Sequence, residues 1–266
     1  MSRDRFVLGF PLGRWETNCY VLGDRSARTA VVIDPGEGGT EIVPDVLARE
    51  GVTCAAIMLT HGHLDHLWAA PELGEKLEVP IFLHPHDRWL WDNPAVGFGS
   101  VPPDALEWLL GRPWVAPTGR LEDLEDGQRL SYHSIELEAR HTPGHTPGHV
   151  TFLVGGLGDA ELLLAPDLQA SGVPAGQQQA LLSGDLLFRD SVGRTDLPRG
   201  STDDLFESIA RSVLPLGDDL LVLPGHMQVT TLGRERTHNP FLTRLGAGRR
   251  PGQGPQGPGW AGQDRL

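Results

Sequence analysis

Cysteine and lysine are scarce in this chain, and long apolar runs are missing. Its two cysteines, Cys19 and Cys54, lie in apolar, strand-like segments, which is typical of packed thiols and argues against a disulfide framework. Lys76 is the single lysine, and the formal charge of −13 argues against binding to nucleic acid or to an anionic membrane. No apolar run approaches the ~20 residues that a membrane-spanning helix needs. We therefore expect a protein of the reducing cytoplasm, with neither nucleic acid nor a membrane as its partner.

The most distinctive segment is 60–66, where three imidazoles and a carboxylate fall within six consecutive residues. It directly follows an apolar run that predicts a buried strand, so these side chains are expected on a loop at the strand's carboxyl end. Alternate residues of a tight loop can point at one spot, as His61 and His63 would, while Asp65 and His66 would reach a second position nearby. Imidazole and carboxylate suit zinc, iron or manganese. Four ligand-type residues at this spacing argue against a merely solvated turn.

Apolar periodicity predicts alternating strands and helices along most of the chain. The expected strands are 18–22, 29–33, 55–59, 79–83, 130–139, 150–154, 181–185 and 220–223. The expected helices are 41–50, 69–77 and 202–213. This alternation favours an α/β fold in which two mixed sheets pack face to face with helices outside.

Two stretches interrupt this pattern, and a third ends it. Residues 85–120 are rich in proline and tryptophan, which predicts an irregular covering loop with one short helix near 104–110 and tryptophans that mainly pack. Residues 155–180 are rich in glycine, alanine and glutamine, which predicts a flexible insertion. Glycine and proline also dominate the C-terminus, so we expect one domain over 1–245 and a disordered tail over 246–266.

Ligand-type residues recur in later segments of the chain, each in a loop that follows a predicted strand. These residues are His145, Asp185 and His226. Loops at strand ends are where α/β folds collect their functional residues, so the three are expected to join the first cluster.

In these segments the chain resembles the metallo-β-lactamase superfamily, and within it the glyoxalase II-like hydrolases, especially the short bacterial type II hydroxyacylglutathione hydrolases. The family motif T-H-x-H-x-D-H stands at 60–66, T-P-G-H-T-x-G-H at 142–149, G-D at 184–185 and P-G-H at 224–226. The sequences at 193–196 and 235–242 also resemble those of this family. The resemblance implies a four-layer αββα sandwich of two mixed sheets with helices outside.

The resemblance also implies a ligand set for two divalent metal ions. One ion would take His61, His63 and His145, the other would take Asp65, His66 and His226, and Asp185 would bridge them. Zinc is the favoured ion, with iron or manganese as alternatives. Such a pair would hold a bridging hydroxide as the nucleophile, and Asp65 and Asp185 would be the catalytic residues that orient it. His149 would hydrogen-bond a ligand residue, and Arg194 would contact substrate or pair with Asp196.

The implied substrate is a small thioester, hydrolysed to a hydroxy acid and a thiol. Its thiol carrier stays open, because glutathione thioesters are anionic and this chain is acidic. The arginines available to bind an anion near the site are Arg189, Arg194 and Arg199. The sequence also leaves the oligomeric state open.

The main alternative is the related persulfide dioxygenase, a sulfur oxidoreductase with a single iron. Its ligands match the positions of His61, His145 and Asp185. The histidine at position 149 and the sequence around His226 both favour the hydrolase. A metal-dependent nuclease would share the ligands but conflicts with the net charge.

Other histidines beside these motifs have plainer interpretations. His84 and His86 follow a predicted strand, but Asp87 is the one carboxylate near them, so we interpret them as ordinary polar residues and not as a further metal site. His141, four residues before His145, is left open between a hydrogen bond to the site and the surface.

Overall fold

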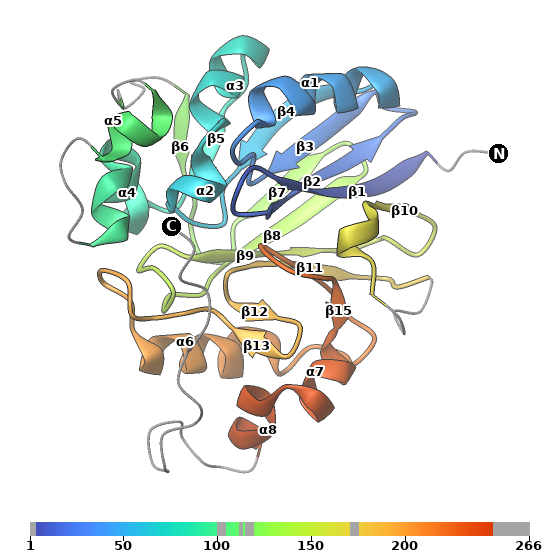
Figure 1. The fold of residues 1–266 in the computed structure, drawn as a ribbon. Coiled ribbons are helices and arrows are strands. Elements are labelled where there is room, and N and C mark those ends of the chain that lie inside the picture. Colours follow the sequence, from blue (N-terminus) through green and yellow to red (C-terminus); the bar gives the residue numbers. More distant parts are fainter. Residues whose placement is uncertain (1–3, 100–104, 112–113, 115–119, 171–175, 247–266) are drawn as a thin grey trace.

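The computed structural model describes residues 4–99, 105–111, 114, 120–170 and 176–246. Two mixed sheets pack face to face, and helices cover both outer faces, so the predicted four-layer αββα sandwich is confirmed (Figure 1). The tail predicted over 246–266 lies outside the described residues, apart from Gly246 at the end of the last helix. Among the described residues, every helix is too short or too polar to cross a membrane.

The first sheet has seven strands and begins with an antiparallel meander. From edge to edge they are β10 (Glu161–Leu164), β1 (Arg5–Leu12), β2 (Thr17–Asp24), β3 (Thr29–Ile33), β4 (Thr53–Met58), β5 (Ile81–Leu83) and β6 (Leu121–Asp123). Strands β3 to β6 run parallel, so their carboxyl ends meet at one edge. The crossovers include α1 (Gly39–Glu50) and α3 (Ala70–Leu77), which lie on the outer face (Figure 1).

The second sheet has six strands and is mostly antiparallel. From edge to edge they are β15 (Thr230–Thr231), β14 (Leu221–Pro224), β11 (Ala180–Gly184), β9 (Val150–Val154), β8 (Ile135–His141) and β7 (Arg129–Tyr132). A short hairpin of β12 (Leu187–Phe188) and β13 (Ser191–Val192) follows β11. The outer helices are α6 (Thr202–Ser208) with a π-helical turn at Ile209–Val213, α7 (Leu232–His238) and α8 (Pro240–Gly246).

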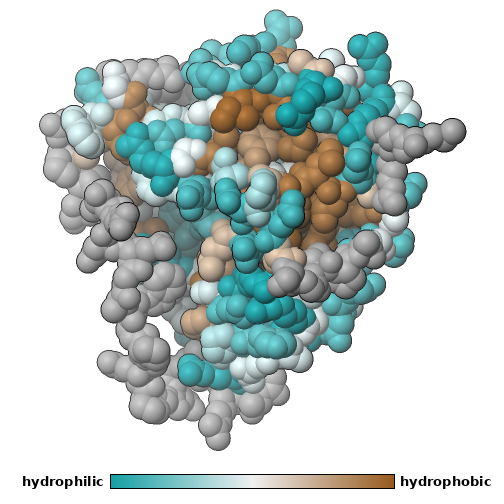
Figure 2. All heavy atoms as spheres, turned by 45° about the vertical axis from the view of Figure 1, so that its right-hand side comes forward, coloured by the Kyte–Doolittle hydropathy of each residue, from teal (hydrophilic) through white to brown (hydrophobic). Residues whose placement is uncertain are grey.

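The apolar core is divided by the sheets into three layers. One cluster fills the space between the two sheets, and the other two lie between each sheet and its helices. Alternation along a strand explains this division: in β1, Val7 faces the inter-sheet core, whereas Leu8 faces the helices. On the side where β1 lies, Figure 2 shows apolar side chains at the surface, bordered by polar ones. Phe10 of β1 and Leu163 of β10 are partly buried and pack against the cluster between this sheet and its helices.

Three local predictions differ from the structure. The single strand expected over 130–139 is a hairpin, because His133 adopts a left-handed φ of 57° and reverses the chain between β7 and β8. The insertion expected over 155–180 contains β10, whose leucines pair with β1. The signal for this strand was its apolar run at 162–164, which the surrounding glycines and glutamines outweighed.

The segment expected to be an irregular covering loop holds more helix than predicted. It contains η1 (Pro85–Asp87), α4 (Arg88–Asp92), η2 (Pro94–Phe98) and α5 (Ala105–Leu110), the last close to the helix expected near 104–110. Trp91 is buried, and Trp114 donates a hydrogen bond from Nε1 to its carbonyl (2.9 Å), as expected for packing tryptophans. Trp108 is 84% exposed and departs from that expectation.

Candidate metal centre

The first three predicted ligands converge on one point. The loop after β4 leads into the short helix α2 (Leu64–Leu67) and presents His61 and His63. The Nδ1 atom of His63 lies 3.1 Å from Nε2 of His61 and 2.9 Å from Nε2 of His145. Ligand nitrogens on a tetrahedral zinc ion lie about 3.3 Å apart, given metal–nitrogen bonds of 2.0–2.1 Å. The three imidazoles are therefore spaced as a metal triad.

The second predicted triad lies beside the first. Oδ2 of Asp65 is 3.4 Å from Nε2 of His66 and 3.1 Å from Nε2 of His226. Asp185 stands between the triads: its Oδ2 is 3.5 Å from Nε2 of His145, and its Oδ1 is 3.4 Å from Nε2 of His66. The fold thus brings together all seven residues that the sequence proposed as metal ligands.

The ends of both sheets are tied together at this point. Val150 N–H donates to Thr60 O, and Asn18 N–H donates to Gly225 O, both at 2.7 Å. Asn18 Nδ2 also donates to Pro224 O (2.9 Å). The loops from the first and second sheets are consequently held against each other by backbone groups that belong to neither triad.

The hydrogen-bond network fixes which nitrogen of each ring faces the centre. The Nδ1 atoms of four rings each meet an oxygen: Thr60 Oγ1 for His61, Asp34 Oδ2 for His66, Arg194 O for His145 and Trp15 O for His226. Since carbonyl and carboxylate oxygens only accept, Nδ1 carries a proton in the last three, so each of these rings has its lone pair on Nε2 when it is neutral. This is the tautomer that a metal ligand requires.

Two buried carboxylates that the sequence did not single out support the centre. Asp34 accepts hydrogen bonds from Thr60 N–H (2.8 Å), Thr60 Oγ1 (2.7 Å) and His66 Nδ1 (2.9 Å). The sequence motifs did not single it out, although its position directly after β3, next to the motif strand, is a usable signal.

Asp87 plays a comparable part for the other loops. Its Oδ2 accepts from Gly62 N–H (3.0 Å) and Thr146 Oγ1 (2.6 Å), and its Oδ1 accepts from Gly148 N–H (2.7 Å). One fully buried carboxylate therefore joins the loop of the first two histidine ligands to the loop of His145. No local pattern could have shown this, because its partners are 25 to 61 residues away.

His149 and Arg194 contact the ligand residues through the backbone. His149 accepts a hydrogen bond at Nε2 from Asp185 N–H (3.0 Å), while its Nδ1 meets Thr142 Oγ1 (2.9 Å). The Arg194 guanidinium donates to both carboxylate oxygens of Asp196 (2.7 and 2.9 Å), which is the loop-fixing pair that the sequence allowed as an alternative to substrate contact.

The protonation states of His61 and His63 suit metal binding. Burial is the main cause that lowers the pKa of His63 to about 3, and it holds the pKa of His61 well below its ordinary value. Both rings are therefore neutral at pH 7. Burial alone would raise the pKa of Asp185, but the neighbouring His226 and His66 outweigh it and keep that pKa well below its ordinary range.

The second triad attracts positive charge. Burial disfavours a charged imidazole at His66, yet Asp65 and Asp185 raise its pKa well above the ordinary value. The pKa of His226 is raised as well, despite burial, by the same two carboxylates. The carboxylates therefore favour either protons on these rings or a cation between them.

The buried polar atoms test whether a metal fits. Among the described residues, Nε2 of His66 and Oδ1 of Asp185 are buried and, although they lie 3.4 Å apart, neither forms a hydrogen bond. Such orphaned atoms are costly unless something satisfies them. Both point into the gap between the triads, so a pair of divalent cations fits the donor set in number, type and charge.

Aromatic side chains stand beside the second triad. Trp15, whose carbonyl holds His226, packs against Trp68 and Phe98 at ring-centroid distances of 5.8 and 6.2 Å. Phe98 is 37% exposed, and Trp15 is half-buried. These rings offer an apolar wall next to the polar centre.

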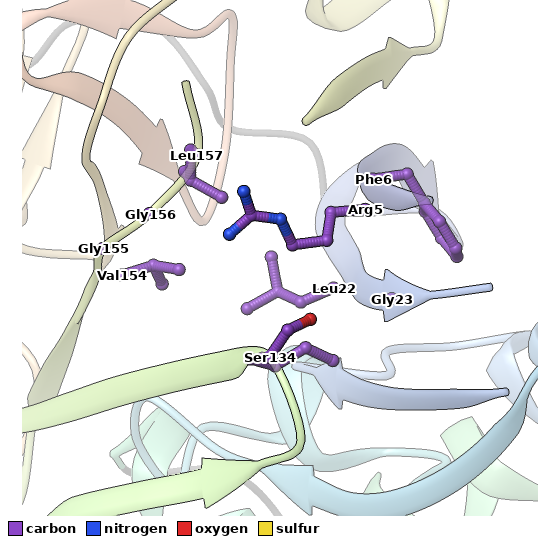
Figure 3. Close-up of a pocket in the computed structure, with 10 residues that line it drawn as sticks. Arg5, Phe6, Leu22, Gly23, Ser134, Val154, Gly155, Gly156 and Leu157 are labelled. Atoms are coloured by element: carbon purple, nitrogen blue, oxygen red, sulfur yellow. The ribbon is translucent and has the colours of Figure 1, made fainter. Parts of the chain in front are cut away.

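A small pocket elsewhere carries none of this chemistry (Figure 3). It lies where β1 and β8 begin and β9 ends, which is the opposite end of the strands from the histidine cluster. Arg5 reaches into it, and this guanidinium pairs with Asp159. Its remaining lining is mostly glycine and aliphatic side chains.

Curated relatives cover nearly the whole chain. An uncharacterised protein of Mycobacterium leprae is 38% identical over 90% of this chain and 99% of its own length. The hydroxyacylglutathione hydrolase GloC of Haemophilus influenzae is 31% identical over 87% of this chain and 95% of its own. The probable metallo-hydrolase YqgX of Bacillus subtilis is 34% identical with the same coverage.

Solved structures and a family model agree with this fold. The B3 metallo-β-lactamase BLEG-1 has a TM-score of 0.71 at 33% identity, covering 90% of this chain and 100% of its own. TTHA1623 in a di-iron-bound form has a TM-score of 0.65 at 35% identity, covering 88% of this chain and 99% of its own. ETHE1 from Myxococcus xanthus has a TM-score of 0.62 at 22% identity, covering 91% of this chain and 84% of its own. At this low identity the match shows the shared fold alone. The family model described as "Metallo-beta-lactamase superfamily" matches residues 12–160, and the chain belongs to that superfamily.

Proposed function

We propose that this protein is a metal-dependent hydrolase of a small thioester, of the glyoxalase II kind, which converts an S-2-hydroxyacyl thiol to a hydroxy acid and a free thiol. The observation that carries the proposal is the complete second triad of Asp65, His66 and His226 beside the first. A one-iron persulfide dioxygenase would not need it. The similarity to GloC supports a thioester as the substrate class.

The two triads would hold two divalent cations, with Asp185 spanning them. Imidazole and carboxylate ligands favour zinc, and the solved di-iron relative supports iron as the alternative. When bound, two such cations lower the pKa of water toward neutrality and place positive charge beside the carbonyl oxygen. The burial of the ligand residues strengthens both effects by excluding bulk water.

Asp65 and Asp185 would act as acceptors for the attacking water. Burial works against ionisation of Asp65, but His66 and His226 hold its pKa below the ordinary value, and Asp185 is likewise ionised. Thr17 Oγ1 donates to Oδ2 of Asp65 (3.0 Å), and His149 holds the backbone N–H of Asp185. Both carboxylates are therefore fixed in direction before substrate arrives, which avoids reorganisation during the reaction.

The thiol carrier would lie along the aromatic wall, and an arginine would meet its negative charge. Arg194 is paired with Asp196, and the Arg199 guanidinium lies over the ring of Trp89 (4.3 Å). Arg189 has a buried Nη1 without a hydrogen-bond partner among the described residues. We keep Arg189, Arg194 and Arg199 as the candidate donors to an anionic substrate.

A thioesterase assay tests the proposal. Zinc-loaded protein should hydrolyse S-D-lactoylglutathione, a chelator should abolish turnover, and added zinc should restore it. Asp185→Asn should lower turnover by roughly 10²–10⁴-fold, because the water then lacks a charged acceptor. Asp203→Asn, an exposed carboxylate on α6, serves as the matched control and should keep full activity.

The same preparations distinguish the competing reactions. Protein with one iron per chain that consumes oxygen with glutathione persulfide would instead be a dioxygenase. Hydrolysis of nitrocefin without thioesterase activity would point to the reaction named for BLEG-1. Fully metal-loaded protein that is inert toward a panel of thioesters would overturn the proposal.

A further inference from the structure

A second group of imidazoles lies outside the candidate metal centre. His84 follows β5 of the first sheet, His86 lies in η1, and His141 ends β8 of the second sheet. Their ring nitrogens include a set of three atoms that all lie within 4.8 Å of one another. The rings of His84 and His141 stack at 4.0 Å with 6° between their planes, and His86 meets both edge-on at 4.8 and 5.6 Å. Residues 57 positions apart are thus gathered at one place on two sheets.

At least one nitrogen of this group is already prepared as a ligand. His141 donates from Nε2 to Pro147 O (2.8 Å), so its Nδ1 keeps a free lone pair. A carbonyl on the opposite nitrogen is the usual support for a metal-binding imidazole. His86 is exposed, and no hydrogen bond to its ring is found among the described residues, so it can turn toward a cation.

His84 is neutral and nearly buried. Burial, together with the neighbouring imidazoles, lowers its pKa to about 4, so the ring does not carry a competing proton at pH 7. Its Nδ1 accepts a long hydrogen bond from His86 N–H (3.3 Å), and binding through Nε2 would give up that weak contact. Asp123 and Asp126 add negative charge nearby, although Asp123 pairs with Arg88 and Asp126 accepts from His141 N–H.

We propose that His84, His86 and His141 form a third divalent-cation site, which takes zinc, copper or nickel and links the two sheets on the outside of the ligand loops. Imidazole nitrogens suit these ions. No carboxylate contributes, and the nitrogens, which lie within 4.8 Å of one another, must close to the about 3.3 Å of a tetrahedral site, so it binds more weakly than the main centre. The exposed His86 can move, and the stacked rings of His84 and His141 must tilt so that their in-plane lone pairs converge on the ion.

The placement gives such an ion a structural effect on its surroundings. Asp87, the residue after His86, joins both ligand loops, and Pro147, which accepts from His141, lies in the loop of His145. An ion held by the three rings would therefore brace the segments on either side of Asp87. Binding of this ion should raise the melting temperature without changing the hydrolytic activity.

Equilibrium dialysis against zinc, with metal counted per chain, tests the site. Wild-type protein should bind one ion more than His86→Ala or His141→Ala at saturating zinc, and His133→Ala, an exposed histidine in the β7–β8 turn, should bind as many as wild type. The melting temperature of the wild type should rise when zinc is increased from half-saturating to saturating. This rise should be lost in His86→Ala and His141→Ala and kept in His133→Ala.

The readout is a difference of one ion, so it does not depend on which reaction the main centre catalyses. Equal ion counts in wild type and both variants would overturn the proposal. So would loss of the ion in the His133→Ala control, which would reveal non-specific binding. His86→Ala should retain whatever hydrolytic activity the wild type shows, because its ring belongs to neither triad.

Discussion

At the scale of single residues, the centre depends on oxygens that fix the direction of each ring. His145 is held by the carbonyl of Arg194, His226 by that of Trp15, and His66 by the carboxylate of Asp34. A free imidazole would sample both tautomers, so these contacts remove half of its states before a metal arrives. We therefore expect residues outside the ligand set to affect how tightly metal binds.

Asp87 offers a direct test at this scale. Asp87→Asn replaces one acceptor oxygen by an NH2 group that faces the Gly62 or Gly148 N–H or the Thr146 hydroxyl. The two ligand loops should loosen, and metal affinity should fall by about 10–100-fold. Competition with a chromophoric chelator measures the affinity, and Asp92→Asn, an exposed carboxylate on α4, is the control. Unchanged affinity in Asp87→Asn would show that the loops hold their geometry without it.

Asp24 gives a pH-dependent prediction. Burial opposes its ionisation, but hydrogen bonds from Ser134, Ser26 and the Ala27 N–H lower its pKa to about 2. An unfolded aspartate has a pKa of about 3.9, so the folded state gains about 2 kcal/mol above that pH and loses it as the pH falls toward 2. Asp24→Asn should therefore be less stable near neutrality, with the gap closing in acid.

Urea unfolding of both proteins from pH ~6 down to ~3 measures this gap. Asp45→Asn, an exposed residue of α1, should show no such pH dependence. A constant difference between wild type and Asp24→Asn over the whole range would contradict the assignment.

At the scale of elements, tight turns hold the ligand loops against the strand ends. Gly193, just after β13, donates its N–H to Leu186 O (3.2 Å) and lies so close to Asp185 that an added Cβ would fall 1.8 Å from the Asp185 carbonyl oxygen. Gly144 adopts a φ of 143° and passes directly over the backbone of Leu205 in α6. The shape of each loop is thus set by the element that it crosses.

Gly193→Ala should displace Asp185 as well as strain the hairpin. We expect a loss of about 1–3 kcal/mol in the free energy of unfolding, together with a loss of bound metal. Gly155→Ala is the matched control, since an added Cβ there meets no atom within 4 Å. Urea unfolding and metal content measure both effects. Native stability and full metal content in Gly193→Ala would mean that the hairpin can shift without moving Asp185.

At the scale of the whole molecule, the candidate metal centre lies between the two sheets and takes ligands from both. His61, His63, Asp65 and His66 follow a strand of the first sheet, whereas His145, Asp185 and His226 belong to loops of the second. An ion that binds both sets stabilises the folded chain, because it has no comparable site in the unfolded chain.

Removal of the metal should therefore lower the melting temperature as well as end the activity. With metal at about 100 times its dissociation constant, the stabilisation is about 2.7 kcal/mol, which corresponds to a shift on the order of 5–10 °C. Differential scanning calorimetry with and without chelator measures it. In Asp185→Asn the shift in melting temperature should be smaller. An equal melting temperature for the metal-free and metal-loaded wild type would contradict the claim that metal binding stabilises the contact between the two sheets.

The sequence indicated the sandwich, the strands that carry the site and the seven candidate ligands, because apolar periodicity and closely spaced histidines are local patterns and because the motifs at 60–66, 142–149, 184–185 and 224–226 resemble a known family. It did not single out Asp34, although the place of this residue after β3 was a usable signal. It could not show Asp87 or the carbonyls that orient the rings, because each of these acts on residues far along the chain. It also left His84 and His86 as ordinary polar residues, since their third partner, His141, comes from the other sheet. Only the packing of the two sheets brings such groups within hydrogen-bond distance, and distance decides what they can bind.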